Sequence, residues 1–457
     1  MITNEQQTII DTIASTDDIV LVSAVAGSGK TSTALVVVDT LKPKKALYTA
    51  FNKAIVVEGT SKFTSNVECK TLHALALSYV RPKMKISDFT YLCIKEDLSY
   101  PDKLLIIDTI DNFFRSASID MYDYFRDMLT DRLANLAAKY IEGMIHDTVN
   151  PTFNFLLKYF HILLVNEDIK VNYDLVILDE IQDSTAVALE IFKLLSSPKK
   201  LGLGDPHQAI YGFMNLVNGF EVLTDATVLP LSKSFRCSSN IALGIEIFCN
   251  KHIDKSITFT GTDTPIDDGL TAYITSTNAQ IVYRLHELHE EGKSYSLTRT
   301  IPEIFAALLA LNNASYGKEI YHKKYKFLEG EYKNYTISGS KSFFGYLKQN
   351  VDDKEIHNAI DVLIRFGKSH VNIFEVLKQA KANIPNPAIT VGTAYSLKGL
   401  GFSTVYIEDD LNDTIRDIIM KGGPENDADE TQLKLYYVSA SRCRQNLLNA
   451  KHIILEN

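Results

Sequence analysis

The sequence predicts an α/β fold with two parallel-sheet regions, each interrupted by an insertion. Short apolar runs at 19–24 and 45–51 flank a helical pattern, an order typical of a parallel sheet covered by helices. Apolar runs of the same kind return at 173–180 and 200–205. A second series follows, at 272–276, 388–395, 404–410 and 452–455.

Four parts follow from this order. The first sheet region is expected at 1–80 and 171–224, and the second at 225–311 and 381–457. Segment 81–170 has apolar residues at helical spacing, which predicts a helical insertion. A shorter insertion is expected at 312–380.

The composition is that of a globular protein with room for about three domains of ~150 residues. The 457 residues include 23% charged residues and have a net charge of −9. Affinity for phosphate backbones depends on Lys and Arg, so this balance argues against a generally basic surface. It leaves room for a local basic groove.

The five cysteines are scattered, and none forms a C-x-x-C pair. That argues against a zinc site or a disulfide framework, and favours a reducing compartment. The N-terminus has no basic region of the signal-peptide kind, and the apolar runs are far shorter than the ~20 residues of a membrane span. We therefore expect a cytoplasmic protein, in the host cytoplasm if the gene is viral.

The first chemical motif is AVAGSGKT at 24–31, between an apolar strand and a helix. In such a loop the backbone N–H groups and the helix dipole face phosphates. Gly27 and Gly29 let the backbone wrap closely. Lys30 can reach the β- and γ-phosphates, and Thr31 can bind Mg²⁺. Ala24 stands where the usual pattern has glycine.

The second motif is LVILDEIQD at 175–183, an apolar strand that ends in two carboxylates. Both would lie at the carboxyl edge of the sheet, beside the phosphate loop. Asp179 is expected to hold Mg²⁺, and Glu180 to polarise the attacking water as general base. The alternative is a solvated acidic loop.

The third motif is GDPHQAIYGF at 204–213. Gln208 follows a strand end, where an amide can sense the γ-phosphate. Tyr211 and Phe213 offer flat faces on which bases stack, at ~1–3 kcal/mol each. The alternative for Phe213 is a core aromatic.

Two arginines, Arg236 and Arg442, lie in the second sheet region. An arginine that reaches across from a second domain neutralises the transferring phosphoryl group and makes hydrolysis depend on domain closure. Taken alone, each would be interpreted as a surface arginine.

Nine blocks resemble, in family order, the conserved motifs of superfamily 1A helicases, the UvrD/Rep/PcrA group. They are TNEQQ at 3–7, AVAGSGKT at 24–31, TAFNKA at 49–54, TLHALA at 71–76, DEIQD at 179–183, GDPHQAIYGF at 204–213, LSKSFRCSSNI at 231–241, TAYSLKGLGF at 393–402 and YYVSASRCR at 436–444. The GDPHQ-IY-F form, SGSKSF at 338–343 and the helical run at 352–379 look closest to the F-box DNA helicase branch. No F-box precedes the motifs, so ubiquitin-ligase function is not expected.

The resemblance implies two RecA-like domains (1A and 2A) with insertions 1B and a reduced 2B, and it implies ATP and Mg²⁺. Gln7 would read adenine and Phe235 would stack on it. The implied nucleotide site also includes Ala26, Gly27, Ser28, Gly29, Lys30, Thr31, Ser32, Arg236, Gly399 and Arg442. The implied single-strand contacts are Thr49, Phe51, Asn52, Thr71, His73, Tyr211, Phe213, Thr393 and Tyr395.

The sequence departs from the family at several of these positions. Phe213 replaces a tryptophan, and Met214 an arginine. Ala50 occupies the slot of a stacking phenylalanine, with Phe51 next to it. Tyr395 stands for a histidine, and Gly401 for a glutamate expected near the ribose.

The implied function is a monomeric ATP-dependent helicase that moves 3′–5′ on single-stranded DNA and separates duplexes in replication, recombination or repair. Its partners would be single strands, single/double-strand junctions and replication or recombination proteins, without a membrane. Insertion 1B would split the duplex or serve as a structural brace. The alternatives are a translocase that displaces proteins with little strand separation, a small-molecule P-loop kinase or generic NTPase, and an inactive DNA-binding scaffold.

Overall fold

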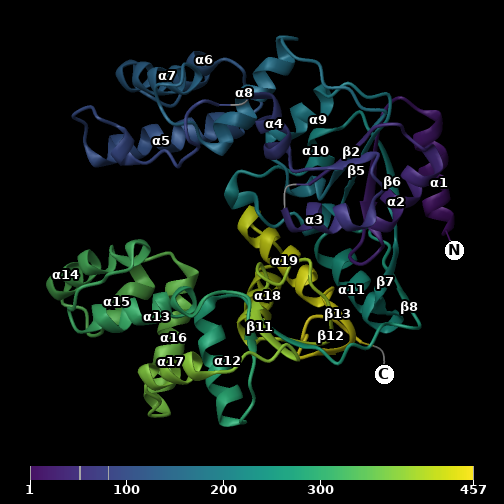
Figure 1. Ribbon diagram of the computed structural model, residues 1–457. Helices are drawn as coiled ribbons and strands as arrows, with labels where there is room; N and C mark the ends of the chain where they lie inside the picture. The colour runs from purple at the N-terminus through teal and green to yellow at the C-terminus, as the bar shows by residue number, and fades with distance from the viewer. Residues whose placement is uncertain (1, 51–52, 81, 456–457) are drawn as a thin grey trace. The chain divides into compact units, whose positions relative to one another are not determined.

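The computed structural model describes residues 2–50, 53–80 and 82–455, which form two compact units, Met1–Leu231 and Ser232–Asn457. Each unit contains a parallel sheet covered by helices (Figure 1). The predicted α/β class, with two parallel sheets and helical insertions, is therefore confirmed.

The first unit is built on a six-stranded parallel sheet in the order β3-β2-β4-β5-β1-β6. Its strands are β1 Ile19–Ala24, β2 Ala46–Ala50, β3 Val67–Cys69, β4 Leu175–Asp179, β5 Lys200–Gly204 and β6 Thr227–Leu231. Its helices are α1 Asn4–Ser15, α2 Lys30–Leu41, α3 Lys53–Lys62, α4 Leu72–Val80, α5 Tyr100–Arg115, α6 Met121–Arg126, α7 Asp131–Ile145, α8 Phe153–Val165, α9 Ala186–Leu194 and α10 Gly219–Val222.

Both faces of this sheet are buried, which explains why its strands are almost continuously apolar. Because side chains alternate along a strand, Val20 and Val22 of β1 pack in one core with α1 and α2, whereas Leu21 packs in another with α4, α8 and α9. The strand order brings the carboxyl ends of β1, β5, β4 and β2 side by side. The chemical motifs leave the sheet at these ends.

The insertion between α4 and β4 is helical. Helices α5 to α8 enclose a core of their own, which includes Phe113, Phe125 and Ile141, and Figure 1 shows α5, α6 and α7 standing away from the sheet of this unit.

The first sheet reaches further along the chain than the expected limit at 224. Strand β6 follows that limit, yet it pairs in parallel with β1 from Val20↔Thr227 to Ala24↔Leu231. Its apolar residues therefore complete the edge of the first sheet.

The second unit contains a five-stranded parallel sheet, β10-β11-β9-β12-β13, and a separate pair, β7 with β8. The strands are β7 Lys233–Ser238, β8 Thr260–Thr262, β9 Thr271–Thr275, β10 Ser296–Leu297, β11 Ile389–Thr393, β12 Phe402–Ile407 and β13 Cys443–Leu448. The helices are α11 Ser239–His252, α12 Asn278–Glu290, α13 Ile301–Ser315, α14 Leu328–Ser338, α15 Phe343–Asn350, α16 Lys354–Lys368, α17 Ile373–Ala382, α18 Asp409–Met420 and α19 Asp427–Ala440. Helices α13 to α17 lie between β10 and β11 in the chain and share one apolar core with α12.

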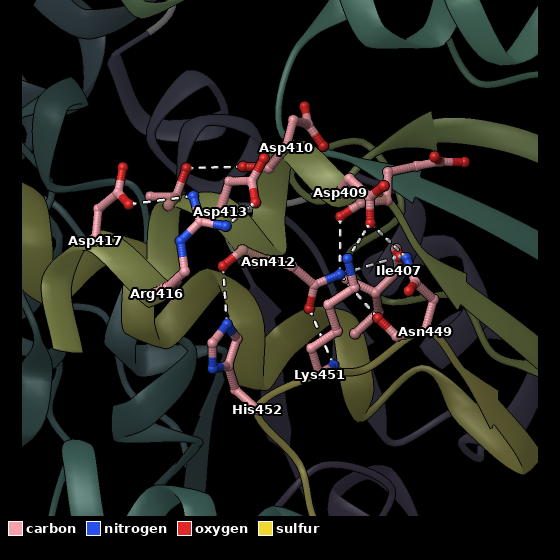
Figure 2. A network of polar contacts seen from close by, with 12 residues as sticks. Ile407, Asp409, Asp410, Asn412, Asp413, Arg416, Asp417, Asn449, Lys451 and His452 are labelled. Atoms are coloured by element: carbon pink, nitrogen blue, oxygen red, sulfur yellow. Dashed lines mark hydrogen bonds and ion pairs between the residues drawn. The ribbon is translucent and has the colours of Figure 1, made fainter. Parts of the chain in front are cut away.

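A polar network fixes the segment after β13 to α18 (Figure 2). The buried Asn412 of α18 donates from Nδ2 to the Asn449 carbonyl at 2.8 Å, and its carbonyl contacts Nε2 of His452 at 2.8 Å. Asn449 in turn donates to the Ile407 carbonyl at 2.8 Å, at the end of β12. Buried amides of this kind stabilise one arrangement because each of their polar atoms has a partner.

Among the described residues, no helix has the length and hydrophobicity that crossing a membrane requires.

Candidate nucleotide site

The phosphate loop joins β1 to α2 at the carboxyl edge of the first sheet. Gly27 and Gly29 have positive φ, 76° and 84°, a conformation that favours glycine. The loop is anchored where the Val25 N–H donates to the Leu231 carbonyl of β6 at 3.0 Å, and the Ser28 N–H to the Val25 carbonyl at 3.1 Å. It ends at Lys30, the first residue of α2.

The loop has the properties of an anion site. The N-terminus of α2 provides unpaired N–H groups and the positive end of a helix dipole. In the part of the chain that the structure describes, the buried Ser28 Oγ has no hydrogen-bond partner. Thr31 is partly exposed and Ser32 exposed on the first turn of α2, whereas Ala26 is buried in the loop. These residues fit a bound phosphate chain.

Lys30 and Glu180 form an ion pair of 2.8 Å across the sheet edge. Burial alone would lower the pKa of Lys30, but Glu180 and then Asp179 and Asp205 outweigh burial and raise it above its ordinary value. The lysine is therefore a fixed positive charge close to the loop, as a phosphate ligand must be.

Asp179 ends β4, in register with Ala50 of β2 and Leu203 of β5. Its Oδ2 accepts a hydrogen bond from the Tyr48 hydroxyl at 2.5 Å, and its Oδ1 accepts from the Glu180 N–H at 2.8 Å. Burial and the adjacent Glu180 raise the pKa of Asp179, while Lys30 and Tyr48 oppose that rise. A cation placed here would favour the ionised carboxylate.

Glu180 has φ of 54°, which is rare for a residue other than glycine and turns its side chain toward Lys30. The Gln182 side chain stabilises this arrangement. Its Nε2 donates to Glu180 Oε2 at 2.5 Å, and its Oε1 accepts from the Asp205 N–H at 3.1 Å. Asp205 Oδ2 then accepts from the Gln208 amide at 2.7 Å. Gln208 is thus connected to Glu180 through two buried side chains.

The two glutamines of α1 lie on different sides of the helix. Gln7 lies on the exposed side of α1 and donates to Asp11 at 2.8 Å. Its neighbour Gln6 is 6% exposed and donates to Thr33 of α2 at 3.0 Å. Gln6 also completes a capping box with Thr3. The helical period of 3.6 places these adjacent glutamines on different faces.

In the first unit, the residues expected to contact single-stranded DNA lie near the end of β2, at the start of α4 and in the loop after β5. Thr49 is buried; Thr71 accepts from the Ala74 N–H at the start of α4, and His73 contacts Asn154 of α8 at 3.4 Å. Burial and the nearby Arg115 lower the pKa of His73, against the opposing contact with Asn154. Phe51 and Asn52 lie outside the described residues.

Phe213 is not a core residue, because its side chain is 70% exposed. Its ring centroid lies 6.3 Å from that of Tyr211, at a tilt of 58°. The adjacent Met214 carbonyl accepts from Arg115 of α5 at 3.0 Å. The exposed aromatic loop is therefore held to the helical insertion.

In the second unit, Phe235 and Arg236 lie on β7, and Phe235 is partly exposed beneath the Lys233 ammonium, 5.7 Å from the ring centroid. Arg236 donates to the Ser441 carbonyl at 3.2 Å. Arg442 is 2% exposed, and its guanidinium donates to the Val438 carbonyl at 2.9 Å and the Leu400 carbonyl at 3.3 Å, among its contacts. Both arginines thus lie beside Ser441, a residue of the short connection between α19 and β13.

The loop between β11 and β12 carries the remaining candidates. Thr393, at the end of β11, is buried and donates to Ser396 at 3.2 Å; burial raises the pKa of Tyr395. Gly399 has φ of 91°. A Cβ at Gly401 would lie 3.2 Å from Arg236 Nε, so the glycine leaves room for this arginine.

Four side chains of the first unit belong to this site although sequence reasoning did not select them: Gln6, Tyr48, Gln182 and Asp205. Gln182 and Asp205 lie inside the motifs DEIQD and GDPHQ, so their polar side chains beside the catalytic candidates could have indicated a role. Tyr48 lies in an apolar strand, one residue before the TAFNKA block at 49–54, and so falls outside the motifs.

Fold and site together define a P-loop nucleotide-binding protein with two RecA-like sheet units. Residues 6–214 match an AAA domain family. The chain is 25% identical to "F-box DNA helicase 1" of Gallus gallus over 99% of this chain and 49% of that protein, and 25% identical to "F-box DNA helicase protein 1" of Schizosaccharomyces pombe over 53% and 32%. It is 29% identical to "RecBCD enzyme subunit RecB" of Borreliella burgdorferi over 24% and 12%.

These similarities support a relation of the chain to the UvrD-like superfamily 1 helicases, with the F-box DNA helicases among its relatives. The chain spans at most about half the length of the curated relatives it matches.

Proposed function

We propose that this chain is an ATP-dependent DNA helicase that moves 3′–5′ along single-stranded DNA and separates duplexes in replication, recombination or repair. The observation that carries the proposal is the cluster of Lys30, Asp179 and Glu180 around a glycine-rich loop at one sheet edge. The direction of movement and the process rest on the resemblance to superfamily 1A helicases alone.

Lys30 and the loop N–H groups would bind the phosphates of ATP, and Glu180 would orient the attacking water and accept its proton. Thr31 and Asp179 would hold Mg²⁺, which supplies positive charge to the phosphoryl oxygens when bound. Lys30 and Glu180 form an ion pair in this structure, so substrate phosphates would compete with Glu180 for the ammonium and release the carboxylate for its role as base.

Arg236 and Arg442 are proposed to stabilise charge on the transferring phosphoryl group, with Phe235 stacked on adenine. The support is the motif resemblance together with the position of both arginines beside Ser441.

Single-stranded DNA is the proposed track. Exposed Phe213, beside Tyr211, has the accessible flat face that base stacking requires. Thr71, His73, Thr393 and Tyr395 are proposed to line the same path. We assign α5–α8 to the 1B insertion and α13–α17 to a reduced 2B insertion, and propose a monomeric motor that works at single/double-strand junctions, in the cytoplasm, with replication or recombination proteins as partners.

The test uses forked and singly tailed DNA duplexes with the full chain, ATP and Mg²⁺. Strand separation that requires a 3′ tail supports the proposal, and separation that requires a 5′ tail contradicts its direction. A parallel reaction contains a protein bound to the single strand. Displacement of that protein without separation of either duplex would favour a translocase over a helicase.

A further inference from the structure

The buried Tyr48 of β2 contacts Asp179, one of the two side chains to which the proposed function assigns Mg²⁺. Its side chain is 0% exposed, and its hydroxyl donates to Asp179 Oδ2 at 2.5 Å. Tyr48 and Asp179 lie on neighbouring strands, because β2 pairs with β4 up to Ala50↔Asp179. The phenol therefore holds the carboxylate at the end of β4.

The ring of Tyr48 has a dedicated place in the fold. Gly59 lies in the interior of α3, and a Cβ at this position would come within 2.8 Å of the Tyr48 ring. A glycine inside a helix costs ~1 kcal/mol relative to alanine. Phe63 also packs against the ring, with its ring centroid 4.8 Å from that of Tyr48. The Tyr48 side chain is thus fixed at its ring by Gly59 and Phe63 and at its hydroxyl by Asp179.

The Tyr48 hydroxyl is one of two donors that fix the Asp179 carboxylate. Asp179 Oδ1 accepts from the Glu180 N–H at 2.8 Å. Each carboxylate oxygen thus has one fixed donor and retains acceptor capacity for an ion or its water.

We propose that Tyr48 is a positioning residue for the Mg²⁺–nucleotide site, whose hydroxyl orients the Asp179 carboxylate for the ion. The inference rests on the proposed function, because it takes Thr31 and Asp179 as the metal-binding pair. Partners that orient metal ligands commonly change metal affinity 10–100-fold when they are removed. A purely structural tyrosine would affect stability alone.

The test is Tyr48→Phe, which removes one oxygen and keeps the ring between Gly59 and Phe63. Binding of a fluorescent, non-hydrolysable ATP analogue is titrated with Mg²⁺, and Mn²⁺ binding in the presence of ADP is followed by electron paramagnetic resonance. We expect the Mg²⁺ midpoint to rise about 10-fold and Mn²⁺ to bind more weakly. Analogue affinity without metal should stay at the wild-type value, and turnover at saturating Mg²⁺ should approach it.

Tyr173→Phe is the matched control. Tyr173 is also a buried tyrosine of the first unit, and its hydroxyl donates to a carboxylate, Glu68, at 2.6 Å. It precedes β4, at the opposite edge of the sheet from Asp179. Its loss should cost comparable stability without moving the Mg²⁺ midpoint.

Two failures are distinguishable. If wild-type protein does not bind the analogue at any Mg²⁺ concentration, the proposed function fails. If wild-type protein binds it and Tyr48→Phe has the same Mg²⁺ midpoint and Mn²⁺ affinity, the role of Tyr48 is overturned. Thermal unfolding without metal identifies a temperature at which both variants are folded, so that loss of structure does not imitate loss of metal affinity.

Discussion

At the phosphate loop, individual residues meet because strand ends are adjacent, although they are far apart in the chain. Lys30 and Glu180 are 150 positions apart and form an ion pair. A lysine so placed is stabilised by carboxylates and would exchange one of them for phosphate when substrate binds. The loop therefore has the positive charge that phosphate binding needs.

The two glutamines of α1 provide a test at the scale of one residue. Gln6→Ala removes the capping box and the bond to Thr33, so we expect a loss of about 1 kcal/mol in the free energy of unfolding. ATP should also bind more weakly, because α1 is no longer fixed to α2. The measurements are urea unfolding and ATP titration.

Gln7→Ala is the matched variant, because Gln7 is exposed and pairs with Asp11 one turn away. We expect its stability within about 0.5 kcal/mol of wild type. If Gln7→Ala alone weakens ATP binding, and GTP binding is unchanged, then Gln7 reads adenine as the family resemblance implies.

At the scale of elements, the helical insertion of the first unit is joined to the motif loops by polar side chains. Arg115 of α5 donates to the Met214 carbonyl and pairs with Asp111 at 2.9 Å. Asp111 accepts from Asn154 of α8, which contacts His73 of α4. The loop that carries Phe213 and the helix that carries His73 thus share one set of contacts through the insertion.

The insertion also contains a buried lysine with a predictable pH dependence. Lys158 of α8 donates to the Ser116 carbonyl at 2.8 Å, and burial lowers its pKa from 10.5 to about 7. The unfolded chain holds this proton up to about pH 10.5, whereas the folded chain releases it near 7. Folding therefore releases a proton within this window, and the contribution of Lys158 to stability rises from pH 7 to about 10 and is lost as pH falls.

Urea unfolding of wild type and Lys158→Met at pH 7 and at about pH 9.5 tests this dependence. Methionine keeps the volume and removes the titrating amine, so wild type should gain stability relative to the variant at the higher pH. A difference that stays the same at both pH values would show that Lys158 keeps its ordinary pKa in the fold.

At the scale of the whole molecule, local patterns predict the parts whose determinants lie close together in sequence. The strand, glycines and helix of 19–41 are contiguous, and the two parallel sheets follow from the repeated apolar runs. The expected limit at 224 places β6 in the second sheet region, whereas β6 pairs with β1 of the first sheet. A short strand with exposed Val228 has no local feature that indicates its partner strand.

Contacts between distant residues were beyond sequence reasoning. Tyr48 and Asp179 are 131 positions apart, and only the adjacency of β2 and β4 brings them together. Whether Gln6 or Gln7 faces α2 depends on the rotation of α1 about its axis. The sequence of one helical turn does not determine that rotation. The motifs indicate the residues that would meet the nucleotide, but not which other polar side chains, such as Gln182 and Asp205, support them.

The proposed function requires that DNA binding and ATP hydrolysis are coupled in this chain. Steady-state ATPase activity of the full chain is measured with and without single-stranded DNA, beside RNA of matched length, for wild type and Glu180→Gln. We expect strong stimulation of wild type by single-stranded DNA, and no turnover in Glu180→Gln although the variant still binds DNA. Wild-type activity that is unchanged by DNA, or near-normal activity of Glu180→Gln, would contradict the proposed function.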